Sequence, residues 1–406
     1  MLARYLAGAV AARTGNEMSG PALLVLALAV TRSPVVASSL LAGLTVSAAV
    51  GGPLLGVLLD RAGRPGRMLG LTMAGYAAGL VLIVLGIPYL PHALLIGIAV
   101  VTGLLGPAMA GGWTAQLPLV ATGDRLARAN ALDAMTYNVG GLAGPAAVGV
   151  IATTAGPQPA ALAAVALIVA AVAGAWSLPR RADAATAGNT AGDTAADTAR
   201  DTAGDAARDP AKARGVRAEL AAGFSAIARP GPLRRATATS VVSIAGEAMF
   251  VVCAPLLGAR LLGEPGYGAM LLTVMAVAGL AANAVLARVR HDPDVLLVAT
   301  TLVLGLALAL AALATSFALA VVAAALAGLA EGPQLTALFA VRHRESPPRL
   351  RSQIFTTGAS LKITSFALGS AAAGPLATVS PGLALLVGAG IQVLAALTFA
   401  ALSRRP

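Results

Sequence analysis

The chain has 406 residues, of which 58% are hydrophobic and 11% are charged, and its mean hydropathy is +0.83. Because roughly a quarter of the residues of a soluble domain are charged, this composition argues against a water-soluble fold. The net charge of +11 does not indicate nucleic acid binding, since the bases lie between long apolar runs and not on a polar domain. Cys253 is the sole cysteine and has no partner for a disulfide or a metal site. We therefore expect no metal and no cofactor.

Twelve apolar stretches are long enough to cross a bilayer, which takes about 20 residues. They cover residues 4–31, 34–59, 67–87, 93–118, 129–154, 158–178, 236–261, 268–288, 294–315, 317–341, 352–377 and 382–402. Their many alanines and glycines suit close helix packing in lipid. The sequence therefore predicts an all-α integral membrane protein with twelve transmembrane helices.

The basic residues between these stretches alternate in number. Of the 28 Lys and Arg residues, 24 fall on one side of the predicted membrane and two, Arg32 and Arg260, on the other. Cytoplasmic loops retain Lys and Arg. The asymmetry predicts a multi-pass protein of the cytoplasmic membrane whose N and C termini are both cytoplasmic.

Residues 179–235 separate an N-terminal bundle, residues 1–178, from a C-terminal bundle, residues 236–406. The first part of this linker is rich in Ala, Thr, Asp and Arg, with an aspartate at every fourth position from Asp193 to Asp209. Such a composition buries too little apolar surface to fold alone, so we expect disorder there. A docking role for a regulatory partner is the alternative. Residues 216–227 turn amphipathic, which predicts a helix on the membrane surface.

The two bundles show weak internal similarity, which predicts that each is a copy of one six-helix unit. The matching positions, at offsets of 225 and 226 residues, are Gly106 and Pro107 with Gly332 and Pro333, Trp113 with Phe339, Arg125 with Arg351, and Gly144 and Gly149 with Gly369 and Gly374.

An ordered motif joins the second and third stretches: Gly56, Asp60, Arg61, Gly63 and Arg64 in the pattern G-x-x-x-D-R-x-G-R. Glycine at its start permits close helix contact, and its aspartate is placed to accept hydrogen bonds from a neighbouring helix N-terminus. The second glycine suits a tight turn, and the arginines suit the lipid surface. An ordinary basic loop explains the arginines but not the ordered Gly, Asp and Gly.

This segment resembles the loop 2-3 signature of the major facilitator superfamily, and the resemblance extends to the twelve stretches, the long central loop and the repeat. It implies a fold of two six-helix pseudo-repeats. It also implies that Asp60, Arg61 and Arg64 form a cytoplasmic charge lock that holds one conformation and is released during transport. Pro65 stands where the family usually has another base.

The fifth stretch contains Gly140, Gly144, Pro145 and Gly149. This pattern resembles the glycine and proline motif of the family's exporters. Small residues with a proline also serve packing and kinking in many spanning helices. The arginine motif that many proton-coupled exporters carry in the fourth stretch is absent, because residues 101–116 contain no base.

Four stretches carry ionisable groups near their middle: Glu17, Glu247, Glu331 and Lys362. Such groups are costly in a membrane and usually face a cavity or a partner. In the family that the chain resembles, spans 1, 4, 7 and 10 line the central cavity, which implies cavity positions for all three glutamates. A structural pair between Glu17 and Arg13, one turn earlier, is the alternative for Glu17. Glu331 has Lys362 or Arg13 as its alternative partner. It precedes a glycine and a proline, which predict a break in the helical hydrogen-bond ladder that exposes backbone polar groups to substrate.

Further candidates for contact with substrate are Asn16, Trp113 and Gln116. Trp113 also suits an anchor at the membrane interface. Asp133 is interpreted as the partner of a loop arginine. The three histidines are placed in connections between helices.

These features predict a secondary transporter that exports small amphipathic or cationic molecules in exchange for protons, by alternating access. Its expected partners are the substrate, protons and the lipid bilayer, and we expect a monomer. Uptake or facilitated diffusion of a nutrient or metabolite is a second hypothesis, and a non-transporting receptor or scaffold is a third. The sequence shows no nucleophile paired with a base and no nucleotide-binding loop, so nothing in it indicates an enzyme.

Overall fold

The computed structural model describes residues 1–123, 125–180, 216–263 and 267–403, and all regular secondary structure within these ranges is helical. The part of the linker predicted to be disordered, with its regularly spaced aspartates and its docking alternative, lies outside the described residues.

The first half contains six membrane spans, two of which are composite. Its helices are α1 (Leu2–Thr31), α2 (Pro34–Val46), α3 (Ala48–Arg61), α4 (Pro65–Gly86), α5 (His92–Gly103), the 3-10 turn η1 (Gly106–Ala108), α6 (Gly111–Thr114), the 3-10 turn η2 (Leu117–Leu119), α7 (Arg125–Thr154) and α8 (Pro157–Trp176). The second span is formed by α2 and α3, and the fourth by the elements from α5 to η2.

The second half follows after a short helix. Its elements are α10 (Val216–Ala228), α11 (Pro232–Leu262), α12 (Tyr267–Leu286), α13 (Pro293–Ala312), α14 (Phe317–Glu345), the 3-10 turn η4 (Pro348–Leu350), α15 (Arg351–Val379) and α16 (Pro381–Ser403). The twelve predicted spans are confirmed.

Eight of the described segments are long and apolar enough to cross a membrane by composition alone, and α12 is apolar over the shorter stretch Met270–Leu286. The other three spans, α1, α7 and α15, contain charged residues in their interior, including Arg13, Asp133 and Lys362. Such residues are tolerated in a membrane when they face the interior of the bundle. These three spans therefore contribute polar side chains to the interior of the bundle.

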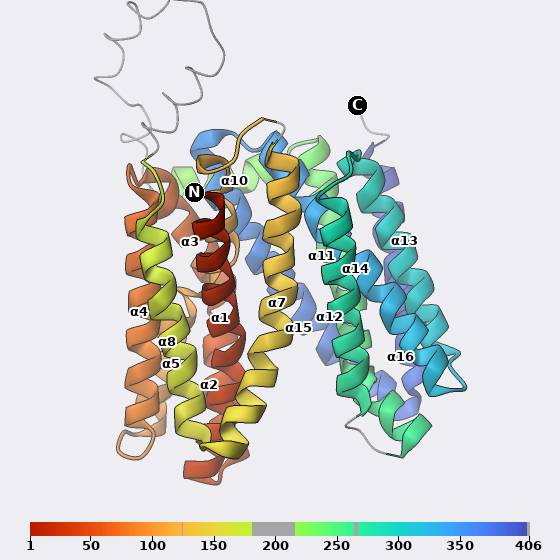
Figure 1. Cartoon of the computed structure of the whole chain (residues 1–406), viewed down its shortest axis with the longest axis horizontal. Helices are drawn as coiled ribbons and strands as arrows, with labels where there is room; N and C mark the ends of the chain where they lie inside the picture. The colour runs from red at the N-terminus through yellow and green to blue at the C-terminus, as the bar shows by residue number, and fades with distance from the viewer. Residues whose placement is uncertain (124, 181–215, 264–266, 404–406) are drawn as a thin grey trace, which may run out of the picture.

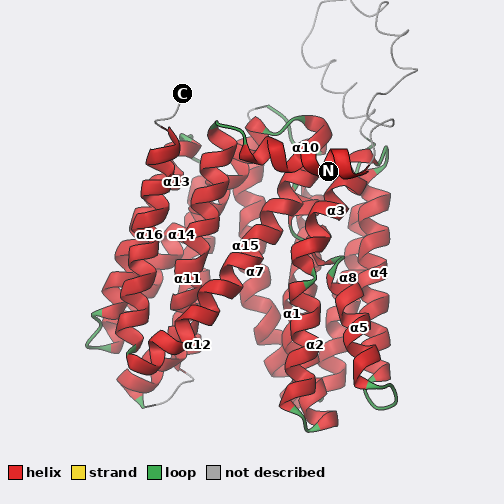
Figure 2. Ribbon diagram, turned by 180° about the vertical axis from the view of Figure 1, so that it is seen from behind, coloured by secondary structure: helices red, strands yellow, loops and turns green. Residues whose placement is uncertain are grey.

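The halves stand side by side, and α1 begins at the end of the molecule at which α16 ends (Figure 1). We call this end the proximal end and the opposite one the distal end. Each half has its own apolar core, and a third cluster joins them through Ala115 and Ala134 of the first half and Phe339 and Phe355 of the second. The ribbons of the two halves diverge toward the distal end in both views (Figures 1 and 2).

The fourth span is interrupted, whereas its counterpart in the second half is not. Gly106, Pro107 and the glycine pair at 111 break the fourth span into short turns, and Gly111 lies against the backbone at Phe355. By contrast, α14 runs continuously through Pro333, which lacks an N–H donor and so removes one rung of the helical hydrogen-bond ladder near Glu331. One proline removes one backbone hydrogen bond, and spanning helices tolerate that loss.

Helix α10 lies across the proximal end (Figure 2) and packs against α3 and α15. The predicted amphipathic helix is present. Part of its apolar side is covered by protein, since Ile227 packs with Leu350 and Ile354, whereas Phe224 stays exposed. Arg61 of α3 forms an ion pair with Glu219 of α10, with 2.6 Å between Nε and Oε2. The helix thus contacts both halves.

Candidate functional site

A cavity of about 570 Å³ lies between the two halves. Its wall comes from α1, α2, the fourth span at α6 and α7 of the first half, and from α11, α12, α14 and α15 of the second. It contains five of the residues singled out in the sequence, namely Asn16, Glu17, Glu247, Glu331 and Lys362. A side pocket of about 280 Å³, bordered by α1, α2 and α4, shares Asn16 and Glu17 with it. The three mid-membrane glutamates therefore lie on the wall of one cavity.

The charged groups of the second half form one electrostatic cluster. Glu247 on α11, Glu331 on α14 and Lys362 on α15 interact with one another through space. Among the described residues, neither Glu247 nor Lys362 has a direct hydrogen bond or ion pair, although Glu247 is only 8% exposed. Buried charges without direct partners are costly and mark functional positions in membrane proteins.

Asn138 of α7 connects the halves at this cluster. Its Nδ2 donates to Oε2 of Glu331 at 3.0 Å, and its Oδ1 accepts a hydrogen bond from Nδ2 of Asn283 at 3.3 Å. Thr336 of α14 donates to Asn283 in turn, at 2.9 Å. Gly279 of α12 leaves room for the Asn138 amide. The hydrogen-bond partner of Glu331 therefore comes from the opposite half. Of the two alternative partners, Lys362 acts on Glu331 only through space, and Arg13 is paired elsewhere.

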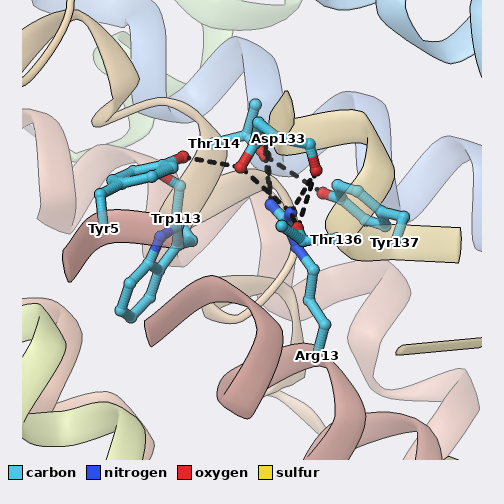
Figure 3. A network of polar contacts seen from close by, with 7 residues as sticks. All are labelled: Tyr5, Arg13, Trp113, Thr114, Asp133, Thr136 and Tyr137. Atoms are coloured by element: carbon cyan, nitrogen blue, oxygen red, sulfur yellow. Dashed lines mark hydrogen bonds and ion pairs between the residues drawn. The ribbon is translucent and has the colours of Figure 1, made fainter. Parts of the chain in front are cut away.

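Arg13 is paired with Asp133 deep inside the first half (Figure 3). Nη1 of Arg13 lies 3.0 Å from Oδ1 of Asp133, and Nη2 lies 3.2 Å from Oδ2. Thr114, Thr136 and Tyr5 hydrogen-bond into the pair. The alternative pairing of Arg13 with Glu17 and the pairing of Asp133 with a loop arginine are both wrong. Glu17 is left facing the cavity.

Trp113 and Gln116 lie away from the cavity, in contrast to the prediction. Trp113 is fully buried, and its ring packs against Gly8 of α1 and lies near Gly174 of α8, so it is not an interfacial anchor either. Gln116 donates to the backbone oxygen of Gly112 and to the hydroxyl of Ser352. Both residues hold the interrupted fourth span in place.

The motif between α3 and α4 acts at the contact between the halves. Oδ1 and Oδ2 of Asp60 accept hydrogen bonds from the backbone N–H groups of Ser352 and Gln353, at 2.9 and 2.8 Å. As expected, the aspartate thus caps the N-terminus of a neighbouring helix, α15, where the helix dipole favours a negative charge. Gly56 lies directly against the backbone of Gln353, which confirms the predicted close contact.

The rest of the motif is less constrained. Arg61 binds Glu219, so its partner is a helix of the chain and not lipid alone. A side chain at Gly63 would meet nothing within 4 Å, and the φ of Gly63 is not positive. The turn therefore accommodates glycine but does not require it. Arg64 precedes α4 and Pro65 is the first residue of that helix, a position that suits proline. This placement explains the departure at Pro65.

The glycine motif of α7 forms its contact with α1. Gly140 lies against the backbone of Arg13, and Gly144 lies against Glu17. Pro145 sits inside a continuous helix, and Gly149 has open space around it. The first two glycines therefore allow the close approach that places Glu17 beside α7.

Two cavity residues escaped the sequence analysis. Tyr137 of α7 has its ring 3.7 Å from the guanidinium carbon of Arg13. Arg342, which was counted among the loop bases, lies within α14, is 2% exposed and lines the cavity. The neighbouring His343 is also buried in α14 and not in a connection. No group of metal-binding side chains was found in the described ranges.

Comparisons with known proteins agree on one family. Residues 5–291 match the model of the Major Facilitator Superfamily. An uncharacterized MFS-type transporter of Sinorhizobium fredii is 33% identical over 172 residues, which cover 42% of this chain and 41% of that protein. The chain therefore matches less than half the length of this relative.

Solved structures of low identity share the fold. The human organic anion transporter MFSD10 has a TM-score of 0.74 at 14% identity, over 98% of each chain. A bacterial homologue of the iron transporter ferroportin, in an outward-facing state, has a TM-score of 0.74 at 13% identity, over 100% of this chain and 99% of the other. The Escherichia coli fucose:proton symporter has a TM-score of 0.72 at 13% identity, over 100% and 98%. These structures agree in fold with the family model that matches residues 5–291, and that match shows that the chain belongs to the Major Facilitator Superfamily of membrane transporters.

Proposed function

We propose that the protein is a proton-coupled secondary transporter that exports small amphipathic molecules bearing a positive charge. The observation that carries the proposal is the cavity between the halves, which holds Glu17, Glu247 and Glu331 together with Lys362. Ionised, these carboxylates attract a cation, and protonated, they do not. Substrate and protons therefore compete for the same groups, and this competition is the basis of exchange.

The aromatic wall of the cavity supports an amphipathic substrate. Tyr137, Phe339, Phe355 and Phe366 all line it. The rings of Tyr137 and Phe339 have centroids 5.5 Å apart, and those of Phe339 and Phe355 are 5.9 Å apart. Aromatic faces bind apolar groups and also attract organic cations.

Alternating access requires that one end be closed while the other is open. The proximal end is closed by the cap of Asp60 on α15 and by the contact of Gly56 with Gln353. We assign this end to the cytoplasm, because the loop bases crowd there in the predicted topology. The cavity in this conformation is then accessible from outside, the state in which an exporter releases substrate and takes up protons.

The hydrogen bond from Asn138 to Glu331 provides a link between protonation and conformation. It joins α7 of the first half to α14 of the second. Protonation of Glu331 weakens a charge-assisted bond between the halves. The equilibrium between cavity orientations then depends on the proton bound at this carboxylate.

The test uses the full chain reconstituted in vesicles that contain a pH-sensitive dye, with tetraphenylphosphonium as the probe cation. We expect a gradient of the probe to drive protons in the opposite direction. The double variant Glu247→Gln, Glu331→Gln is expected to lose this proton movement. The control Glu345→Gln, at the end of α14 and outside the cavity lining, is expected to retain it.

Other outcomes separate the alternatives. Unchanged proton movement in the double variant contradicts the roles of Glu247 and Glu331. Movement of probe and protons in the same direction indicates uptake by symport, and probe flux without protons indicates facilitated diffusion.

A further inference from the structure

Arg342 is unusual among the buried arginines of the structure. It is 2% exposed, and its Nε and Nη2 have no hydrogen-bond partner among the described residues. In contrast, four of the five N–H groups of Arg13 are directed at acceptors on Asp133, Thr114 and Thr136. A guanidinium that is removed from water without an acceptor is energetically unfavourable. Its presence at a cavity wall therefore indicates a functional role.

Within the part of the chain that the structure describes, no carboxylate pairs with Arg342. The guanidinium carbon lies 5.8 Å from the ring centroid of Phe355, and Gly358 of α15 leaves the space that the guanidinium occupies. The charged or titratable groups that act on it are Tyr137 of α7, Lys362 of α15 and the neighbouring His343. Lys362 carries the same charge, and neither Tyr137 nor His343 is negatively charged or accepts a hydrogen bond from the Nε or Nη2 of Arg342.

Its position along α14 places it at the proximal wall of the cavity. Arg342 follows Glu331 by 11 residues, about 16 Å along the helix axis. Its side chain slants back toward the helix N-terminus, as helical side chains do, and so toward Glu331 and the cavity that both residues line. The cavity therefore has acids in its middle, aromatic rings beside them and a lone guanidinium at its proximal wall.

We propose that Arg342 binds an oxyanionic group of the transported molecule, a carboxylate or a phosphate. A planar guanidinium offers paired N–H donors that match such an oxyanion. The inference rests on the proposed function in one respect, that the cavity holds the substrate. It deepens the proposal by making the substrate zwitterionic, with its cationic group at the glutamates and its anionic group at Arg342.

The test measures binding of matched probes to the purified full chain by calorimetry, without transport or a proton gradient. The probes are 3-phenylpropionate, 2-phenylethylphosphonate and 3-phenylpropylamine, which share a phenyl ring on a short chain and differ in charge. We expect Arg342→Gln to weaken binding of at least one of the two anions by about tenfold or more, the loss typical for a charge-assisted hydrogen bond. Binding of the amine is expected to stay unchanged. The anion that loses affinity identifies the oxyanion.

Two controls separate binding from folding. Arg342→Lys keeps the charge but not the paired donors, and is expected to bind the anion with intermediate affinity. Arg235→Gln removes an arginine that is already paired with Asp294 outside the cavity, and is expected to bind all probes as the wild type does. Without a probe, the melting temperature of Arg342→Gln is expected to equal or exceed that of the wild type, whereas a purely structural role for Arg342 predicts a lower one.

The proposal is overturned if neither anion binds the wild type, or if Arg342→Gln binds both anions as tightly as the wild type does. Failure of proton coupling in the vesicle assay leaves these binding results unaffected, so the two proposals fail separately.

Discussion

Asp133→Asn is the variant for which the structure predicts the largest loss of stability. Arg13 and Asp133 are 3% and 0% exposed, so water cannot replace the lost carboxylate. The variant removes the negative charge opposite Nη1 and Nη2, at 3.0 and 3.2 Å, and leaves the arginine charged. Breaking a buried pair by removing one partner costs about 3 to 5 kcal/mol.

The double variant Arg13→Gln, Asp133→Asn is expected to be far milder, at about 1 to 2 kcal/mol, because it leaves hydrogen-bonding groups but no unpaired charge. Arg13→Gln alone leaves Asp133 ionised and is expected to cost as much as Asp133→Asn. The two single losses together should therefore exceed the loss of the double variant by about 4 kcal/mol or more, which is the signature of direct coupling.

The assay is equilibrium unfolding in mixed micelles by SDS, followed by tryptophan fluorescence. Trp113 is fully buried, with its ring centroid 5.8 Å from that of Tyr5, a member of the network. Replacing the exposed Trp176 by Phe leaves Trp113 as the reporter. As a matched control, Arg344→Gln removes one partner of a surface pair and should cost about 0 to 1 kcal/mol. Additive losses in the cycle, or a loss below about 1 kcal/mol for Asp133→Asn, would refute the reasoning.

Three further predictions concern the gate and the surface. Gly56→Val places a side chain against the backbone of α15, so the proximal end cannot close and transport is lost; wild-type flux in this variant would contradict the contact. In a Cys253→Ser background, the cysteine of Gly141→Cys on the cavity wall should react with an impermeant maleimide added outside the cell. The control Gly390→Cys also has open space around it but lies away from the cavity, and its cysteine should not react. The carboxyl of Asp292 accepts two backbone hydrogen bonds at the start of α13, which lower its pKa. The ionised carboxylate therefore stabilises the start of α13 fully above pH of about 4, and this stabilisation is lost as the pH falls below that value. Asp292→Ala should remove this acid dependence of amide exchange in the first turn of α13.

The spans were predictable because a bilayer imposes a length and a charge asymmetry that survive in the sequence. The same physics revealed the cavity acids, since a lone glutamate such as Glu247 in an apolar span is costly unless it faces a cavity or a partner. The cap of Asp60 on a helix was predictable from its residue type and place. Its recipient, the N-terminus of α15 almost 300 residues away, was not.

The errors share one physical origin, which is that sequence shows neighbours along a helix and not across the bundle. Glu17 lies one turn from Arg13, so the local pair was visible, whereas the actual partner Asp133 lies 120 residues away. Arg342 was missed through a boundary. The predicted tenth span ended at residue 341, but α14 continues for four more residues to Glu345. Arg342 therefore lies in the helix and lines the cavity, where the prediction had placed it in a loop.

Helix α15 connects the gate to the cavity more directly than any loop does. Its first turn is held by Asp60, and Lys362 of the same helix lies in the cavity, nine residues or about 14 Å from Gln353. The helix is continuous between these points. A change of charge at Lys362 thus acts on a rigid element whose other end is held by the opposite half. In the proposed mechanism, the motif in the first half therefore derives its role as a lock from the helix that it caps, and the proposed gating and coupling residues meet on α15 although they come from different halves.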